Sequence, residues 1–285
     1  MRQFGDLPEE YTRLEDALTV ILPVPYDGTS TWIKGADKGP EALIEASCNM
    51  EIYDIETDSE VWETGIHTAE PVTEAGSPEA MSEEVYRRTL DYLDMGKLTV
   101  VIGGEHSVSI GTIRAHHERF KDLTVVQIDA HGDLRQEYEG STHNHACVMA
   151  RARELGPVVQ VGIRSLCTEE LPYVDRDRVF FAHQIRRDPD WMEKAIGLAS
   201  ANVYLTVDLD GFDPSVMPST GTPEPGGLLW YEVNEFIGKL IKARNLVGFD
   251  INELCPNPGA KASDFLAAKL LFRILSMKFT QPDTP

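Results

Sequence analysis

The sequence predicts an α/β fold of three layers, α/β/α, in which helices cover both faces of a mostly parallel central sheet. Short runs rich in Val and Ile recur along the 285 residues, as expected for strands buried on both faces. Stretches with the apolar spacing of helices lie between most of these runs, and this alternation favours parallel strands joined by helices. About seven strand-like runs with irregular loops favour an open sheet over an eightfold barrel.

The elements follow one another along the whole chain. The strand-like runs are 17–22, 98–102, 124–128, 158–163, 178–182, 203–207 and 246–251. The helical stretches are 78–95, 107–119, 146–155, 190–200, 231–244 and 263–278. No Pro/Gly/Ser-rich linker or charged block interrupts this order, so residues 1–285 are expected to form a single domain.

Composition excludes several classes of partner. The net charge of -21 opposes binding to nucleic acid or to an anionic membrane and is compatible with a small cationic substrate. The four cysteines, Cys48, Cys147, Cys167 and Cys255, are scattered without a C-x-x-C pair, so neither a zinc knuckle nor a redox dithiol is indicated. Without an apolar signal core or a run of membrane-spanning length, a cytoplasmic location is expected.

Two short clusters rich in carboxylates each follow a strand-like run. The first reads Asp129-Ala-His131-Gly-Asp133, and the second contains Asp208 and Asp210. Because side chains alternate along a strand, the members of each cluster are expected to project to one side. Buried carboxylates repel one another and are costly to desolvate, so a bound pair of metal ions explains the clusters better than helix caps or salt bridges.

A third segment adds a histidine to these clusters. Gly103-Gly104-Glu105-His106 ends another strand-like run just ahead of a helix. The glycines allow close approach of neighbouring backbone. A lone histidine is more often a core or cap residue, but beside the two clusters metal ligation is the better interpretation of His106.

These three motifs resemble the signatures of the ureohydrolase family, the arginases and agmatinases: Gly-Gly-[Asp/Glu]-His, Asp-x-His-x-Asp and Asp-x-Asp-x-x-Asp-Pro. They occur here in the family order, and segments 25–31, 38–47, 220–227 and 250–253 also resemble family segments. The similarity is greatest to bacterial and archaeal agmatinases. The resemblance implies the arginase/deacetylase-like fold and a homo-oligomer, a trimer or a hexamer.

The resemblance also implies two Mn²⁺ ions per chain. The ligands of one ion would be His106, Asp129, Asp133 and Asp208, and those of the other Asp129, His131, Asp208 and Asp210, so that Asp129 and Asp208 bridge the two ions. A donor set of carboxylates and imidazoles without thiolate independently suits a hard ion such as manganese better than structural zinc. The pair would lower the pKa of a bridging water, and the resulting hydroxide would attack a guanidinium to release urea.

Further roles follow from the resemblance. Glu253 corresponds to the glutamate that binds the guanidinium, and a carboxylate can hold that planar group through paired hydrogen bonds. His145 corresponds to the histidine that carries a proton to the leaving amine, and its neighbour His143 competes for this role or for a substrate contact. Thr222 and Glu224 lie in a Gly/Pro-rich loop that would border the substrate, although the loop is equally typical of a rigid turn.

The sequence indicates less about the end of the substrate that lies away from the guanidinium. Arginases hold the amino-acid end of arginine with asparagines, where this chain has Arg135 and His143, and this difference favours agmatine, cleaved to urea and putrescine. Arg135 could instead face a substrate carboxylate, as in guanidinobutyrate, guanidinopropionate or formiminoglutamate, and a wider pocket could take aminopropylagmatine. Two other classes stay open: a deacetylase with a single zinc ion, and a catalytically silent regulatory paralogue.

Overall fold

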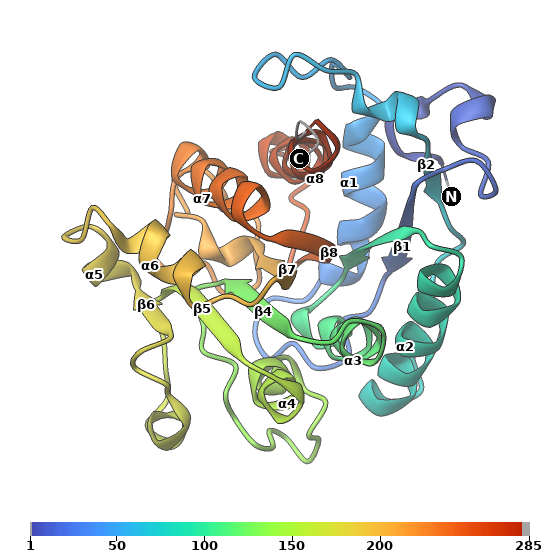
Figure 1. The fold of residues 1–285 in the computed structure, drawn as a ribbon. Helices are drawn as coiled ribbons and strands as arrows, with labels where there is room; N and C mark the ends of the chain where they lie inside the picture. Colours follow the sequence, from blue (N-terminus) through green and yellow to red (C-terminus); the bar gives the residue numbers. More distant parts are fainter. Residues whose placement is uncertain (1, 281–285) are drawn as a thin grey trace.

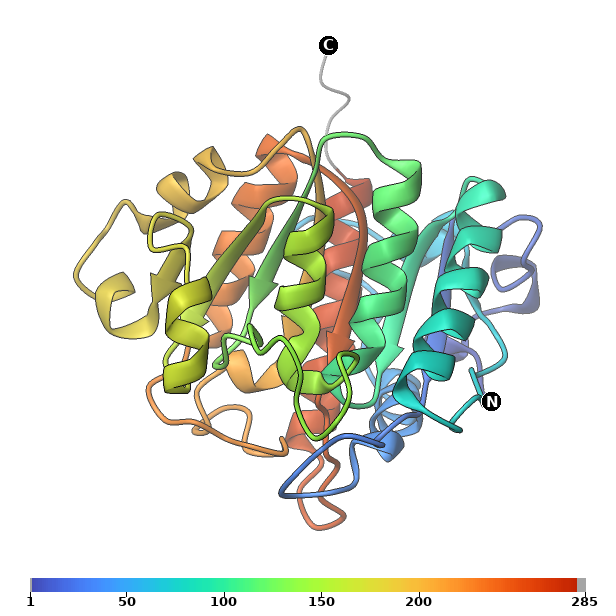
Figure 2. The same ribbon diagram turned by 90° about the horizontal axis from the view of Figure 1, so that it is seen from below.

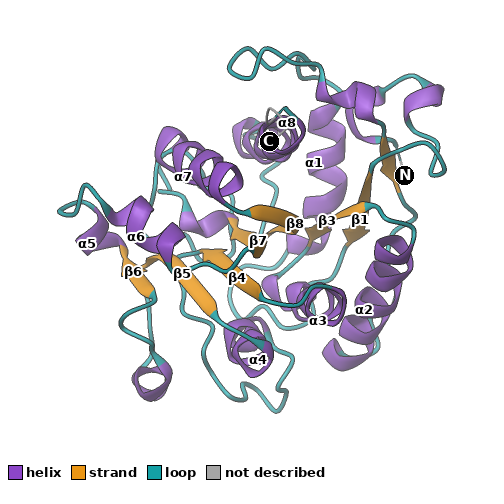
Figure 3. Ribbon diagram, in the orientation of Figure 1, coloured by secondary structure: helices purple, strands orange, loops and turns teal. Residues whose placement is uncertain are grey.

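The centre of the molecule is one eight-stranded sheet in which every strand pair is parallel. The computed structural model describes residues 2–280. The strands are β1 (Thr19–Val24), β2 (Ile66–Thr68), β3 (Leu98–Gly103), β4 (Leu123–Ile128), β5 (Val158–Ile163), β6 (Val179–Phe181), β7 (Asn202–Asp208) and β8 (Asn245–Asn252). Their order is β2-β1-β3-β8-β7-β4-β5-β6, which is an open sheet and not a barrel; Figure 1 labels β2 and Figure 3 labels the other strands.

Helices cover both faces of this sheet, as predicted. They are α1 (Gly39–Ser47), α2 (Pro78–Asp94), α3 (Ser109–Arg119), α4 (Val148–Leu155), α5 (Ala182–Ile185), α6 (Trp191–Gly197), α7 (Trp230–Ala243) and α8 (Ala262–Phe279). In Figure 1, α1, α7 and α8 lie on one face and α2, α3 and α4 on the other. The three-layer α/β/α prediction is therefore confirmed. None of the helices in residues 2–280 combines the length and apolar character that crossing a bilayer requires.

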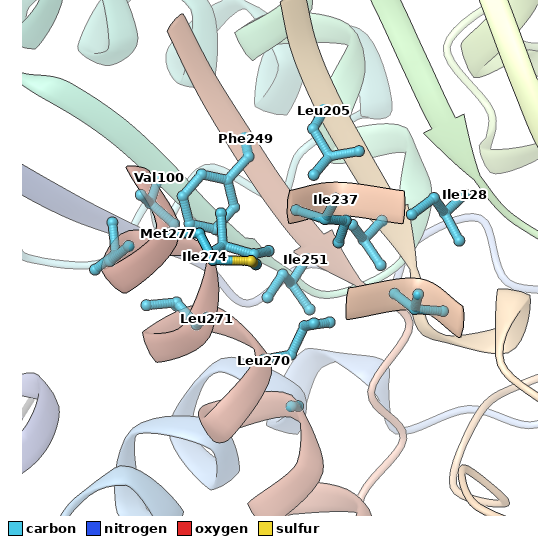
Figure 4. Close-up of a cluster of buried hydrophobic side chains, with 14 of the residues drawn as sticks. Val100, Ile128, Leu205, Ile237, Phe249, Ile251, Leu270, Leu271, Ile274 and Met277 are labelled. Carbon is cyan, nitrogen blue, oxygen red and sulfur yellow. The ribbon is translucent and has the colours of Figure 1, made fainter. Parts of the chain in front are cut away.

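The largest part of the core lies between the central strands and the layer of α7 and α8. Phe249 and Ile251 of β8 point toward Leu271 and Ile274 of α8, beside Leu205 of β7 (Figure 4). Each of these five side chains is at most 1% exposed, and burying one contributes roughly 1.5–3 kcal/mol. Packing on both faces explains why the central strands are continuous apolar runs.

The first strand begins two residues later than predicted and includes a proline. Pro23 has no N–H group, so it is tolerated only where the neighbouring strand needs no donor. Its carbonyl accepts a hydrogen bond from Val72 N at 2.9 Å, on the side where β2 has already ended at Thr68. β2 itself was not predicted, because three residues form too short a run to be recognised.

The predicted strand 178–182 is also shorter than expected. Only Val179–Phe181 pairs with the sheet, and α5 starts at Ala182.

Two strands that are consecutive in the chain are not neighbours at the centre of the sheet. β3 and β4 are consecutive in the chain but are separated in space by β8 and β7. Such a switch point is where open α/β sheets bind ligands, beyond the carboxyl ends of the strands. Figure 2 shows the loops after these strands gathered at the lower edge of the molecule.

Candidate metal centre and substrate cavity

The four strands around the switch point deliver the predicted site residues. His106 lies three residues after β3, Asp129 directly follows β4, Asp208 is the last residue of β7, and Glu253 directly follows β8. These strands are neighbours in the order β3-β8-β7-β4. Residues that lie as much as 147 positions apart in the chain therefore meet at one edge.

The first group of potential metal ligands surrounds His106. Its Nδ1 lies 2.9 Å from Asp133 Oδ2 and 3.2 Å from Asp129 Oδ2. Asp208 Oδ2 lies 3.4 Å from the same nitrogen. All four side chains are nearly inaccessible to solvent, so this group is a compact, buried set of one nitrogen and three oxygens.

The second group lies next to the first and shares Asp129 with it. His131 Nδ1 is 2.9 Å from Asp210 Oδ2 and 3.7 Å from Asp129 Oδ1. Asp129 thus directs one carboxylate oxygen to each histidine, the arrangement that a bridging ligand requires. The ligand atoms of Asp129, His131 and Asp210 lie within 4.8 Å of one another, as do those of His106, Asp129 and Asp208. The bridging role of Asp208 stays a prediction.

Backbone turns, and not the alternation of strand side chains, bring these residues together, which corrects the sequence-based reasoning. β4 ends one residue before Asp129, and Asp133 adopts a left-handed φ of 53°. Asp210 lies in a single 3-10 turn in which its N–H donates to Asp208 Oδ1 at 2.8 Å. Glycine is required at position 211, because a Cβ there would lie 2.9 Å from Asp129 N.

The protonation of His106 shows that the first group fits a cation. Thr206 Oγ1 donates its proton to Asp250 Oδ1 at 2.6 Å, so it must accept from His106 Nε2, which lies 2.8 Å away. In the neutral ring Nδ1 then carries the lone pair, and this nitrogen has no hydrogen-bond partner among residues 2–280. A buried lone pair that faces three carboxylate oxygens is repulsive unless a cation lies among them.

The charge of the site agrees with this conclusion. Burial, with the neighbouring Asp210 and Asp129 carboxylates, raises the pKa of Asp208 well above its usual range. Burial and the Asp129 carboxylate raise the pKa of Asp133 to about 7. Burial lowers the pKa of His106, but the Asp129 and Asp133 carboxylates outweigh it and hold that pKa well above its usual range. Without metal, these raised pKa values mean that the site would bind protons. Two divalent cations would balance the charge of the four aspartates in place of those protons.

A cavity of about 290 Å³ opens over these groups. Its walls include three residues that the sequence predicted for substrate or proton transfer, His145, Thr222 and Glu253. Beyond them the lining is formed by Thr31, Arg135, Tyr138, Ala146, Ser165, Leu166, Cys167 and Glu170. Asp129 is fully buried beneath the cavity, so it reaches a substrate only through bound metal.

Glu253 is held so that its carboxylate can meet a ligand in the cavity. Its backbone has a left-handed φ of 67°, fixed by a hydrogen bond from Glu253 N to Gly104 O at 2.7 Å. Its Oε1 accepts from His106 N at 2.8 Å, which leaves Oε2 for a ligand. Burial and the Glu105 carboxylate raise the pKa of Glu253 well above its usual range, so a bound cation would be needed to keep it ionised.

Two predicted substrate contacts are not supported by the structure. His143 does not line the cavity; its Nδ1 lies 3.0 Å from Thr142 Oγ1 and 4.0 Å from Glu79 Oε1. Glu224 also lies outside the lining, and its backbone carbonyl accepts from Arg164 Nη2 at 2.8 Å. The His143 prediction rested on its nearness to His145 in the sequence and the Glu224 prediction on the family resemblance of its loop, and neither residue lines the cavity. Thr222 lines the cavity, and its hydroxyl donates to Asp210 Oδ2 at 3.3 Å.

Sequence reasoning missed a chain of buried amides beneath Asp129. Gln127 Nε2 donates to Asp129 Oδ2 at 2.6 Å, and Gln160 Nε2 donates to Gln127 Oε1 at 2.6 Å. The two glutamines are paired across β4 and β5. A polar side chain inside an otherwise apolar strand was the available signal, because a buried amide needs partners. These two glutamine side chains orient the Asp129 carboxylate, which the two metal-ligand groups share.

Arg164 is a second supporting residue that was missed. Its Nη2 donates to the carbonyls of Asp210 at 2.6 Å, Glu224 at 2.8 Å and Phe212 at 3.2 Å. One guanidinium thus ties the turn that carries Asp210 to the loop that carries Thr222. Five N–H donors in a rigid plane make arginine suited to this task.

Replacing Arg164 with Ala is expected to leave several half-buried carbonyls without donors and to loosen the turn at Asp210. We expect the free energy of unfolding to fall by about 1–3 kcal/mol and metal affinity to fall by roughly 10- to 100-fold. Chemical denaturation and competitive Mn²⁺ titration measure the two effects. Arg186→Ala is the matched control, because within residues 2–280 the Arg186 side chain has a single hydrogen bond, to Gly227 O. Wild-type metal affinity in Arg164→Ala would exclude the positioning role.

Comparison with known proteins agrees with the site. The model of the Arginase family matches residues 17–276. The chain belongs to the arginase family. Enzymes of this family use a binuclear metal site, and membership therefore confirms the resemblance seen in the motifs and sets aside the deacetylase with a single zinc ion. The two ligand groups of this arginase-family chain are the expected place for such a centre.

Individual relatives match nearly the whole of this arginase-family chain. An N(1)-aminopropylagmatine ureohydrolase from Synechocystis sp. is 41% identical over 94% of this chain and 91% of its own length. One from Thermus thermophilus is 37% identical over 96% of this chain and 94% of its own. The crystal structure of agmatine ureohydrolase of Thermoplasma volcanium superposes with a TM-score of 0.88 at 30% identity, covering 98% of this chain and 95% of that one.

Proposed function

We propose that this chain hydrolyses N1-aminopropylagmatine to urea and spermidine, with Mn²⁺ as the resident metal. The observation that carries the proposal is the Glu253 carboxylate, fixed at the cavity wall beside the two ligand groups. A carboxylate facing a cavity next to a metal pair suits a substrate whose reacting group is itself a planar cation. The guanidinium of an alkylguanidine is such a group.

The chain's own residues would orient the substrate and move the proton. A bound pair of divalent ions supplies a water molecule of lowered pKa as the nucleophile. Glu253 holds the guanidinium with its central carbon toward the metal groups, and this orientation is required because the group is resonance-stabilised. His145 lines the same cavity, where its imidazole can accept the proton that the attacking water releases and pass it to the departing amine nitrogen.

The choice of the longer substrate rests on the named relatives. Two relatives that span more than nine tenths of the chain carry the name N(1)-aminopropylagmatine ureohydrolase. Agmatine, the first prediction from the sequence, shares the guanidinobutyl part of that molecule. The structural neighbour from Thermoplasma volcanium carries the name agmatine ureohydrolase. Both substrates are cations, which agrees with the net charge of -21.

One observation favours a second class of substrate. Arg135 lines the cavity, and its guanidinium carbon lies 4.1 Å from the centre of the Tyr138 ring. A cation held on an aromatic face near the far end of a substrate would attract a carboxylate and repel an ammonium group. Guanidinobutyrate is therefore the alternative that the cavity supports.

A panel of guanidino compounds tests these alternatives with the manganese-loaded protein. We expect kcat/KM for urea release to be about tenfold or more higher with N1-aminopropylagmatine than with agmatine, since contacts of a few methylenes give this discrimination. Guanidinobutyrate is expected to be a poor substrate. The highest kcat/KM with guanidinobutyrate would overturn the assignment, and no urea from any guanidino compound would favour a silent paralogue.

Arg135→Gln provides the matched variant for the panel. If the guanidinium repels the distal ammonium groups, its removal raises kcat/KM for the cationic substrates. If it binds a carboxylate, kcat/KM for guanidinobutyrate falls instead.

A further inference from the structure

The side chains of Thr29, Glu105 and His145 come from separate loops and contact one another. Thr29 follows β1, Glu105 follows β3, and His145 begins a 3-10 turn ahead of α4. Thr29 Oγ1 donates to Glu105 Oε2 at 2.5 Å, and it lies 3.1 Å from His145 Nδ1. Thr29 is 8% exposed and Glu105 is fully buried, so water does not replace these contacts.

Counting protons fixes the direction of each hydrogen bond. A hydroxyl group has one proton and two lone pairs. Glu105 accepts from the Ser107 hydroxyl at Oε1 and from the Thr29 hydroxyl at Oε2, so the single proton of Thr29 points to Glu105. One lone pair accepts from the backbone His145 N at 3.0 Å. The other is left for His145 Nδ1, which must therefore carry a hydrogen and donate it.

The ring of His145 is then fixed in both orientation and tautomer. With the hydrogen on Nδ1, the neutral imidazole has its lone pair on Nε2. The Tyr138 ring stands edge-on to His145, with centroids 6.1 Å apart and planes at 85°, and restricts rotation from another side. His145 lines the cavity, so Nε2 is the nitrogen available to a substrate.

We propose that Thr29, held by Glu105, is a positioning residue that fixes His145 as the Nδ1–H tautomer and so presents the Nε2 lone pair, which takes the proton released by the attacking water and passes it to the leaving amine. The inference rests on the proposed function for its kinetic consequence. Thr29 and Glu105 touch the imidazole or each other and do not contact the reacting atoms. Glu105 corresponds to the carboxylate that orients the histidine of a catalytic triad, but here the Thr29 hydroxyl lies between the carboxylate and the imidazole.

Thr29→Val and Thr29→Ser test this in the manganese-loaded protein. Valine keeps the shape but cannot bond to Nδ1, so kcat for urea release should fall about 10- to 100-fold, as when an orienting partner is lost, with little change in KM. Serine keeps the hydroxyl and should restore most of kcat. Both variants should retain the metal content of the wild type.

Thr124→Val is the matched control. The Thr124 hydroxyl is equally buried, but it bonds Ser200 Oγ at 2.9 Å at the opposite end of β4. Its loss should leave kcat unchanged. An equal fall in kcat in this control, or a fall in Thr29→Val that Thr29→Ser does not restore, would assign Thr29 a merely structural role and overturn the proposal.

A spectroscopic measurement separates the positioning role from the proposed function. In ¹⁵N NMR spectra of the protein loaded with diamagnetic Zn²⁺, His145 should be protonated at Nδ1, and Thr29→Val should shift the tautomer toward Nε2–H. Assignment uses the His145→Asn variant. Burial lowers the pKa of His145 to about 4, so the ring is neutral near neutral pH. An Nε2–H tautomer in the wild type would overturn the positioning proposal even if urea were released, whereas the Nδ1–H form with no urea release would contradict only the proposed function.

Discussion

Asp129→Asn is expected to abolish urea release while the protein remains folded. Within residues 2–280, Asp129 is the one side chain that belongs to both ligand groups, so an amide there weakens both metal positions at once. Metal activation supplies several kcal/mol of barrier lowering, and we expect kcat to fall by roughly 10³-fold or more. The cost in folding should be smaller, about 1–3 kcal/mol, because the amide still accepts from one of its present donors.

Metal analysis, circular dichroism and urea release measure these effects together. Asp54→Asn is a suitable control, because Asp54 is also buried but pairs with Arg273 away from the cavity. It should lose stability and keep both metal and activity. Full activity in Asp129→Asn would show that the metal centre is elsewhere, and an unfolded variant would be replaced by Asp210→Asn, whose carboxylate serves only the second group.

Glu253→Gln is expected to have the second largest effect on activity. The amide can still accept from His106 N through its oxygen, so metal content and fold should be retained. It loses the charge that pairs with a guanidinium, and removing one partner of a buried charged pair costs about 2–5 kcal/mol. We therefore expect kcat/KM to fall by roughly 30- to 4,000-fold. Glu224→Gln, outside the cavity lining, should retain wild-type kcat/KM, and equal losses in the two variants would restore Glu224 to the site.

Glu253→Gln should also change how the stability of the metal-free protein depends on pH. The pKa of Glu253 is raised above its ordinary value of 4.5 by burial and by the Glu105 carboxylate. The unfolded chain then ionises first, so the contribution of this group to stability is complete below pH 4.5 and is lost as pH rises toward the raised value. Melting temperatures measured in mildly acidic and in mildly alkaline buffer should differ less in Glu253→Gln than in the wild type. An equal or larger difference would contradict the pKa shift.

The central features of the site were predictable because metal ligation restricts both residue type and spacing. His106, Asp129, His131, Asp133, Asp208 and Asp210 stand in short motifs, and the structure brings them together. The sheet was predictable because buried parallel strands are continuous apolar runs, such as Val158–Ile163. β2 was not, because its three residues carry no recognisable pattern.

The supporting residues could not be predicted for a different reason. Arg164 contacts carbonyls 46 and 60 residues away, and Thr29 contacts Glu105 and His145 at separations of 76 and 116. Thr29 lies in segment 25–31, which resembles a family segment, but that resemblance gave it no role. The role of each residue exists only once distant turns have met. His143 shows the converse, since its position near His145 in the sequence suggested a substrate contact, whereas the structure places it outside the cavity lining.

The strand order also determines when the metal centre can exist during synthesis. β7 and β8 join two groups of strands, β2-β1-β3 and β4-β5-β6, so without them β3 and β4 would each present an unpaired apolar edge. His106 follows a strand of the first group and Asp129 a strand of the second. The ribosome makes the two joining strands late, and β8 is the last of all. A nascent chain in which β8 has not yet paired would therefore expose apolar strand edges and lack a complete set of ligands, and metal binding would favour the last step of assembly.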